Sequence, residues 1–250
     1  MKIVVFTDTH ANLPALKALA VEIRREGYDA AFHTGDAVGI GPWPAETIDL
    51  LGEIPRLSLL TGNHDAWLCG GLPKGAAPWL TAHYAWLGEQ VARRHINAAA
   101  AWPYLTEHEF EGVRAAFVHY ALKPCGRQVE LPISDQITRD LDALLGRHLL
   151  PDNADNVKPS SPASRDASLI VFHGHRHKPS DLKGKVRYIN PGSLGCWHKP
   201  AARYAIVRFH KGKASIQHKA VPYDQAELLK GFESRKVPDR QLILSSYFAI

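Results

Sequence analysis

The chain has 250 residues, 45% of them hydrophobic and 22% charged, which is the composition of a globular protein large enough to bury a sizeable core. No apolar run approaches the roughly 18 residues that cross a bilayer, and the short apolar start leads directly into "TDTH", so we expect neither a membrane anchor nor a signal peptide. The net charge of +5 suits an anionic substrate, but it is spread along the chain without a basic block and gives only weak support to nucleic-acid binding.

Short apolar runs alternate with helical patterns in the first quarter of the chain. Strands are predicted at 2–6, 29–34 and 56–60, and helices at 13–27 and 44–53. Asn12 can cap the first of these helices and Gly27 can close it. The alternation of strand and helix is typical of a largely parallel sheet with right-handed crossovers, so an α/β fold is predicted.

The second half is predicted to be richer in strands. Helices are predicted over 76–101 and over 134–150, the latter capped by Ser134, and strands at 113–119, 168–172, 185–190, 202–209 and 214–221, the later ones antiparallel. The Pro- and Ser-rich stretch 151–168 is predicted to be an exposed loop within a single domain of residues 1–250. The apolar C-terminal extension, about 223–250, either packs back on the body or joins a subunit interface, so a homo-oligomer stays open.

Polar side chains gather where the predicted strands end. Asp8 and His10 follow the first strand, Asp36 the second, and Asn63, His64 and Asp65 the third; His119 ends the strand at 113–119, and His175 and His177 follow the strand at 168–172. Open parallel sheets bind their ligands outside the carboxyl ends of the strands. Five strand ends are therefore expected to deliver these groups to one rim.

Seven of these groups form a mixed nitrogen and oxygen donor set without cysteine. They are the carboxylates of Asp8 and Asp36, the amide of Asn63 and the imidazoles of His10, His119, His175 and His177. Such donors suit divalent Mn, Fe, Zn, Co or Ni rather than calcium. Because seven donors exceed one tetrahedral zinc site, they suit two ions about 3.5–4 Å apart that share a bridging carboxylate.

The motifs that carry these residues resemble those of the calcineurin-like metallophosphoesterases, in particular the small bacterial and archaeal phosphodiesterase branch. "D-x-H" (8–10), "G-D" (35–36), "G-N-H-D" (62–65), a single His after a strand (119) and "G-H-x-H" (174–177) occur in that order, and "GDAVGIGPWP" and "INPGSLG" add to the likeness. The resemblance covers roughly residues 2–222. It implies a four-layer αββα sandwich of two mixed sheets.

The resemblance also implies roles for individual residues. Asp8, His10 and His177 would hold a first metal ion, Asn63, His119 and His175 a second, and Asp36 would bridge the two divalent ions, with Mn favoured. His64 would face the phosphoryl group and assist the leaving oxygen, and Asp65 would help to orient His64. The implied function is a phosphodiesterase in which a hydroxide that bridges the ions attacks phosphorus.

Two departures from the family pattern bear on the substrate pocket. Ala11 stands where the family usually has Gly after "D-x-H", and Tyr120 stands where Gly often follows the single His. Neither position carries a ligand, so metal binding is expected to survive. Tyr120 and His198 are candidates to contact the substrate, together with Asn63 and His64.

The stretch "FHGHRHK" (172–178) places three histidines at alternate positions. The strand is predicted to end near His173 and Gly174 to turn the chain. His175 and His177 then reach different metals, and His173 remains a structural residue. His33 and Trp43 are likewise interpreted as packing residues.

The three cysteines, Cys69, Cys125 and Cys196, have no CxxC spacing. We expect free thiols in a reducing cytoplasm, with Cys69 and Cys196 acting as buried small apolar residues.

Two other classes of function stay open. A non-catalytic metal-binding scaffold or a nucleotide-binding protein could keep the same fold, although such a protein would be expected to lose ligands. A nuclease would use the same metal chemistry, but the chain lacks a basic stretch interleaved with aromatic residues. The expected partner is therefore a small phosphate ester, with nucleic acid disfavoured and no membrane.

Overall fold

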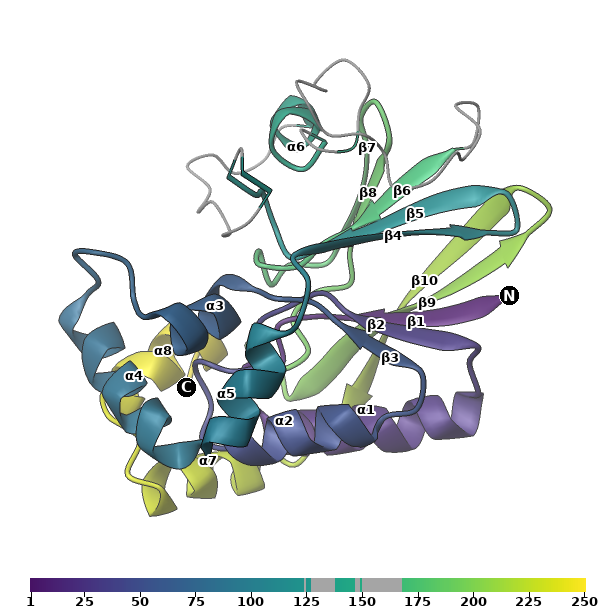
Figure 1. Cartoon of the computed structure of the whole chain (residues 1–250). Helices are drawn as coiled ribbons and strands as arrows, with labels where there is room; N and C mark the ends of the chain where they lie inside the picture. The colour runs from purple at the N-terminus through teal and green to yellow at the C-terminus, as the bar shows by residue number, and fades with distance from the viewer. Residues whose placement is uncertain (124, 127–137, 147–148, 150–167) are drawn as a thin grey trace.

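The computed structural model describes residues 1–123, 125–126, 138–146, 149 and 168–250. Two mixed five-stranded sheets stack on each other (Figure 1). The first sheet has the order β10-β9-β1-β2-β3, with β1 at Lys2–Phe6, β2 at Ala30–His33, β3 at Leu57–Leu59, β9 at Ala201–His210 and β10 at Lys213–Pro222. The second has the order β4-β5-β6-β8-β7, with β4 at Leu105–Phe110, β5 at Val113–Val118, β6 at Leu169–Phe172, β7 at Ser180–Lys183 and β8 at Arg187–Asn190.

The alternation of side chains along β1 shows how the layers are built. Ile3 and Val5 face the second sheet and pack with Phe117 and Phe172, whereas Val4 and Phe6 face the opposite way. That opposite face is covered by α1 (Leu13–Glu26) and α2 (Pro44–Glu53), while α6 (Thr138–Leu144) lies over the outer face of the second sheet (Figure 1). The predicted αββα order of two mixed sheets is confirmed.

The first elements follow the sequence prediction closely. The side chain of Asn12 accepts a hydrogen bond from the backbone N–H of Ala15 at 3.1 Å and so caps α1, and Gly27 follows its last residue. Leu16, Leu19 and Ile23 of α1 are buried against the sheet. β1, β2 and β3 run parallel to one another, so their carboxyl ends meet at one edge.

The middle of the chain departs from the prediction in two ways. The helical stretch 76–101 divides into α4 (Pro78–Gln90) and α5 (Arg93–Ala100). The chain also forms α3 (Asn63–Gly70), β4 and β7, which were not predicted from the sequence. Of the helix predicted over 134–150, α6 is described, while its predicted cap Ser134 and almost all of the predicted loop 151–168 lie outside the described residues.

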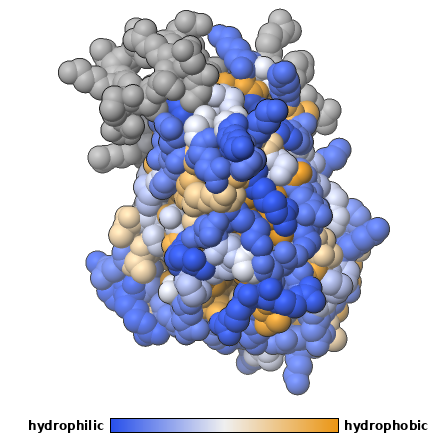
Figure 2. Space-filling view, turned by 90° about the vertical axis from the view of Figure 1, so that its right-hand side faces the viewer, coloured by the Kyte–Doolittle hydropathy of each residue, from blue (hydrophilic) through white to orange (hydrophobic). Residues whose placement is uncertain are grey.

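The C-terminal extension packs back on the body, as the first of the two alternatives predicted. It forms α7 (Gln225–Ser234) and α8 (Arg240–Phe248), whose buried residues Leu228, Phe232, Ile243 and Phe248 cluster with Ile40 and Cys196. The face seen in Figure 2 is mainly hydrophilic with scattered hydrophobic residues. Within the described residues, no helix combines the length and apolarity needed to span a membrane.

Candidate metal centre

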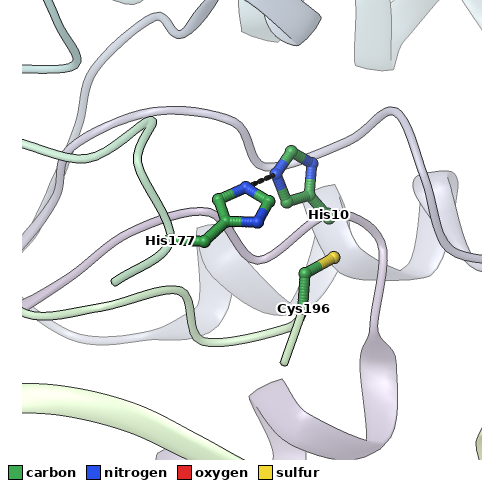
Figure 3. Close-up of side chains that lie close together, drawn as sticks. All are labelled: His10, His177 and Cys196. Atoms are coloured by element: carbon green, nitrogen blue, oxygen red, sulfur yellow. Dashed lines mark hydrogen bonds between the residues drawn. The ribbon is translucent and has the colours of Figure 1, made fainter. Parts of the chain in front are cut away.

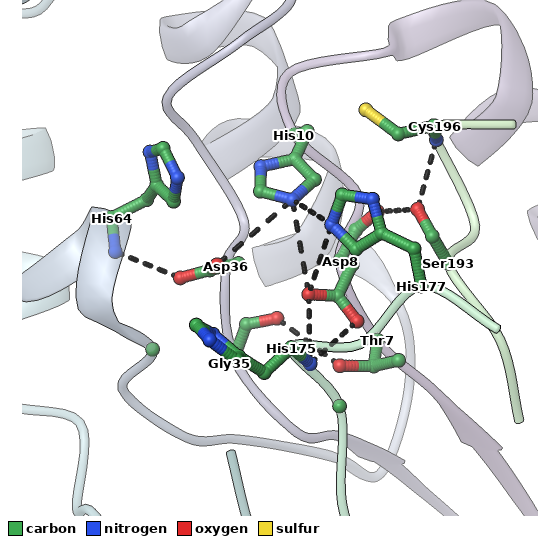
Figure 4. A network of polar contacts seen from close by, with 12 residues as sticks. Thr7, Asp8, His10, Gly35, Asp36, His64, His175, His177, Ser193 and Cys196 are labelled. Carbon is green, nitrogen blue, oxygen red and sulfur yellow. Dashed lines mark hydrogen bonds and ion pairs between the residues drawn. The ribbon is translucent and has the colours of Figure 1, made fainter. Parts of the chain in front are cut away.

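Loops at the carboxyl ends of β1, β2, β3, β5 and β6 converge on one buried polar cluster. Figure 4 shows side chains from the loops after β1, β2 and β6 pointing toward one another, with His64 beside them. The parallel strands of the first sheet and the parallel pair β5 and β6 of the second bring these loops together. The structure therefore brings together the seven predicted ligands, in two groups that meet at Asp36.

The first donor set consists of Asp8, His10 and His177. Nε2 of His10 lies 2.9 Å from Nε2 of His177, and each of these nitrogens lies 3.7 Å from Oδ1 of Asp8. Asp8 and His10 are buried, whereas the side chain of His177 is 21% exposed. The set is therefore open to solvent on the side of His177.

The second donor set consists of Asn63, His119 and His175. Oδ1 of Asn63 lies 3.2 Å from Nε2 of His119 and 2.9 Å from Nδ1 of His175. His119 is fully buried and Asn63 nearly so.

Asp36 lies between the two donor sets. Its Oδ2 is 3.9 Å from Nε2 of His10 and 3.2 Å from Nε2 of His119, so one carboxylate oxygen faces an imidazole of each set. Its Oδ1 accepts a hydrogen bond from the backbone N–H of His64 at 2.8 Å, which ties the carboxylate to the first turn of α3. Burial opposes its ionisation, but the charges of His119 and His64 hold the pKa of Asp36 well below its usual value.

The outer nitrogens of two histidines fix where their lone pairs point. Nδ1 of His10 donates to the carbonyl of Val38 at 3.1 Å, and Nδ1 of His119 donates to the carbonyl of Thr34 at 2.9 Å. In the neutral ring, Nε2 then carries a lone pair and no proton. Metal-bound histidines make this same outer hydrogen bond, which sets the tautomer and the ring orientation.

The inner nitrogen of His119 faces two acceptors, Oδ2 of Asp36 and Oδ1 of Asn63. Burial disfavours a charged ring here, but the carboxylates of Asp36 and Asp8 outweigh burial and raise the pKa of His119 to about 9. In the absence of a metal ion, a proton on Nε2 therefore supplies the positive charge that these oxygens favour. A divalent cation between these donors would take the place of that proton.

The three remaining imidazoles are in the neutral form that a metal requires. Burial lowers the pKa of His10 well below its usual value, that of His175 to about 3 and that of His177 to about 4, so these rings are neutral. Burial also raises the pKa of Asp8 to about 7, against the opposing charge of His119. A cation next to Asp8 would restore its ionised form. The donors therefore fit a divalent transition metal.

The backbone of the ligand loops is held in an unusual conformation. Five ligand residues have a positive φ: Asp8 (51°), His10 (48°), Asp36 (58°), His175 (69°) and His177 (55°). Residues other than glycine rarely adopt this left-handed region, and such strain concentrates at functional sites. Ala11 shares it with a φ of 52°, which explains why glycine suits that position in the family pattern.

Two glycines allow the loops to approach closely. A Cβ atom on Gly62 would lie 2.1 Å from Oδ1 of Asp36, and one on Gly174 would lie 2.0 Å from Oγ1 of Thr7. Any side chain at Gly62 would push Asp36 away from its place between the two donor sets. Both glycines are therefore needed for steric reasons.

His64 lies at the edge of the cluster and is oriented by Tyr84. The hydroxyl of Tyr84 donates to the backbone carbonyl of His64 at 2.9 Å, and it therefore accepts a hydrogen bond from Nδ1 of the His64 ring at 2.8 Å. This pair leaves Nε2 as the ring nitrogen available for proton exchange. Burial lowers the pKa of His64. Tyr84 was not predicted from the sequence, because it lies on α4 and no local motif marks it.

The carboxylate of Asp65 accepts from the backbone. Its described hydrogen bonds all come from backbone N–H groups, those of Asp36, Ala37, Val38 and Gly62, at 2.8–3.2 Å. Burial raises the pKa of Asp65 to about 7, and these donors oppose the rise. Asp65 thus joins the loop after β2 to the first turn of α3, which carries His64, and its influence on the ring of His64 stays a prediction.

The two candidate substrate contacts lie in different surroundings. Tyr120 is buried, with its ring 4.8 Å from that of His175, so it supports a ligand from the core side. His198 is exposed and its ring lies 4.4 Å from that of Trp197. Neither side chain is among the donors of the cluster.

The histidines interpreted as structural stay outside the donor sets. β6 ends at Phe172, and His173 is buried, with Nδ1 donating to the carbonyl of Gly174 at 3.2 Å. His33 accepts from the backbone N–H of Gly35 and contacts Oγ1 of Thr9 at 3.0 Å, so it joins two of the ligand loops.

The cysteines were only partly anticipated. Cys69 was expected to be buried but is exposed, because it lies near the solvent-facing end of α3. Cys196 is buried as expected, yet its sulfur lies with ligand atoms of His10 and His177, all within 4.8 Å of one another. The donor set predicted without cysteine therefore missed a sulfur beside it.

Comparison with known proteins points to one family. The calcineurin-like phosphoesterase superfamily domain matches residues 1–212. An uncharacterized protein of Methanocaldococcus jannaschii is 24% identical over 257 residues, which cover 95% of this chain and 94% of that protein.

Solved structures show the same fold over nearly the whole chain. A metallophosphoesterase from Sphaerobacter thermophilus has a TM-score of 0.67 at 22% identity and covers 97% of this chain and 96% of its own. A hypothetical protein from Pyrococcus horikoshii OT3 has a TM-score of 0.76 at 18% identity and covers 100% and 98%. The C-terminal helices that pack on the body lie within these matched lengths.

Proposed function

Because this chain belongs to the calcineurin-like phosphoesterase superfamily, we propose that it is a dinuclear metal-dependent phosphoesterase that hydrolyses phosphodiesters. The two ions are drawn from divalent Mn, Fe, Zn, Co and Ni, which suit imidazole and carboxylate donors. The first ion would be held by Asp8, His10 and His177 and the second by Asn63, His119 and His175.

The position of Asp36 is the observation that carries this proposal. Its Oδ2 faces Nε2 of His10 on one side and Nε2 of His119 on the other. A shared carboxylate is how two-metal hydrolases hold their ions about 3.5–4 Å apart. A single metal site would need only one of these donor sets.

When bound, the two ions would neutralise charge on the phosphate oxygens. They would also lower the pKa of water, so that hydroxide is available as the nucleophile at neutral pH. The residues of the chain divide the remaining tasks. Asp36 and Asp8 hold the cations in place through their carboxylates. Asn63 contributes a neutral donor, so the second position keeps more net positive charge for the substrate phosphate than a third carboxylate would leave.

His64 is the residue proposed to handle the proton of the leaving group. Tyr84 fixes its Nδ1, so the proton would pass through Nε2. Its ring centroid is 4.9 Å from that of His10, which places it beside the donor sets without being one of the seven ligands.

The direct test is hydrolysis of bis-p-nitrophenyl phosphate by protein stripped of metal and reconstituted with each candidate ion. His64→Ala should lower turnover by about 10²–10⁴-fold while two ions per chain remain bound. Loss of metal in His64→Ala would show that His64 is a ligand. If the reconstituted wild type binds two ions but hydrolyses no phosphate ester, a non-catalytic scaffold would replace this proposal.

A further inference from the structure

A sulfur atom lies beside the first donor set. Sγ of Cys196, Nε2 or Nδ1 of His10 and a ring nitrogen of His177 all lie within 4.8 Å of one another (Figure 3). Cys196 is 1% exposed, so bulk water does not compete for its thiol. The cluster contains two imidazole donors and one thiol, which is a donor set in its own right.

The loop that carries Cys196 is attached to the loop that carries the first ligands. Oγ of Ser193 donates to the carbonyl of Asp8 and accepts from the backbone N–H of Cys196, both at 2.8 Å, and the N–H of Gly195 donates to the same carbonyl at 3.0 Å. A Cβ atom on Gly195 would lie 1.9 Å from the carbonyl oxygen of Thr9, so the two backbones touch. The sulfur and the imidazole of His10 are therefore held in fixed relation.

The hydrogen bonding of His10 leaves its inner nitrogen without a proton. Its Nδ1–H is used on the carbonyl of Val38, so Nε2 presents a lone pair toward Nε2 of His177. The two imidazoles and the thiol each offer a lone pair on atoms that lie within 4.8 Å of one another, and one cation would accept all three.

From this arrangement, and resting on the metal centre of the proposed function, we propose that Cys196 is a sulfur ligand of the first metal position. Binding breaks the S–H bond, forms a sulfur–metal bond and releases one proton to solvent, with no change of oxidation state. Thiolate favours zinc, cobalt(II) and iron(II) over manganese, since softer ions prefer sulfur. The first position is thus selective for a thiophilic ion.

The test uses the electronic absorption of cobalt(II). The background variant carries Cys69→Ser and Cys125→Ser, because both of these thiols are exposed and could bind cobalt independently. Metal-free protein is titrated with cobalt(II), and the near-ultraviolet charge-transfer band of a thiolate–cobalt bond is recorded together with the bound stoichiometry. Cys196→Ser and Cys196→Ala are compared in the same background, with circular dichroism to confirm folding.

We expect the band in the background protein and its loss in both Cys196 variants while cobalt still binds. The preference of the first position for zinc over manganese, measured by competition, should fall by at least about tenfold in Cys196→Ala. Two bound cobalt ions without a charge-transfer band would overturn the sulfur ligand and leave the dinuclear centre intact. Failure of the background protein to bind cobalt at all would overturn both proposals.

Discussion

The two donor sets differ in charge, although Asp36 joins them. Each set has one partly exposed histidine, His177 in the first and His175 in the second. The first contains the carboxylate of Asp8, and the sulfur of Cys196 lies against it. The second contains no carboxylate of its own. In the proposed dinuclear centre, a cation at the second position would therefore keep more of its charge for the substrate, whereas the sulfur would make the first position prefer a thiophilic ion.

Replacing Asp36 should abolish metal binding at both proposed positions, and with it any difference between them. In Asp36→Asn, the affinity for metal and the hydrolysis of bis-p-nitrophenyl phosphate should each fall by more than about a hundredfold, because the shared carboxylate is lost. Asp181→Asn, at an exposed carboxylate paired with Arg187, is the matched control and should retain activity. Metal analysis that still finds two tightly bound ions in Asp36→Asn would contradict the bridging role.

Single ligand variants should separate the two positions. His119→Ala should lose the second ion and His177→Ala the first, each leaving about one ion per chain, because the other donor set is intact. The measurement is the metal content after dialysis against buffered metal. Loss of both ions from either variant would mean that the two positions fill only together.

The proton path should respond to Tyr84 without a change in metal content. Tyr84→Phe removes one hydrogen bond to the ring of His64, so the turnover number should fall by about threefold to tenfold. The KM and the number of bound ions should stay the same. A shift in the pH profile of turnover would identify the loss as one of proton transfer, and an unchanged turnover number would remove Tyr84 from the proposed mechanism.

The smallest effect on the metal centre is expected from His173→Ala, which should bind both ions. Burial lowers the pKa of His173 to about 4 in the folded state, below its value of about 6.5 in the unfolded chain. Its neutral form therefore supports folding above pH about 6.5, and this stability is lost as the pH falls toward about 4. Between pH about 6.5 and about 4, the free energy of unfolding should therefore fall by roughly 3 kcal/mol less in His173→Ala than in the wild type. Urea unfolding at several pH values measures this difference.

Sequence predicted the parts of the fold that rest on local pattern. β1 and α1 follow from a run of β-branched residues and a capped amphipathic helix, and the seven proposed ligands follow from polar residues placed after strands. β4 and β7 were not predicted because they are edge strands rich in polar side chains, such as Glu107 and Glu109 in β4. Such strands lack the apolar pattern that distinguishes a strand from a loop in the sequence.

The missed residues of the site depend on contacts between distant segments. Tyr84 reaches His64 because α4 packs beside α3, and Cys196 reaches His10 because the loop after β8 touches the loop after β1. Neither residue lies in a sequence motif from which its contact partner could be predicted. The lone-pair direction of His119 likewise depends on the carbonyl of Thr34, a backbone atom on another strand end.

Five of the proposed ligands have a left-handed backbone, so the residue that favours folding at these positions differs from the residue that binds metal. Replacing such a residue by glycine would relieve about 1–2 kcal/mol of steric strain, which exceeds or matches the roughly 0.5–1 kcal/mol of added chain entropy. The backbone terms of losing His10 or His177 in this way therefore roughly cancel. The chain would thus gain no stability from keeping these proposed metal ligands, and the abundance of a variant without them would alone say nothing about whether it binds metal.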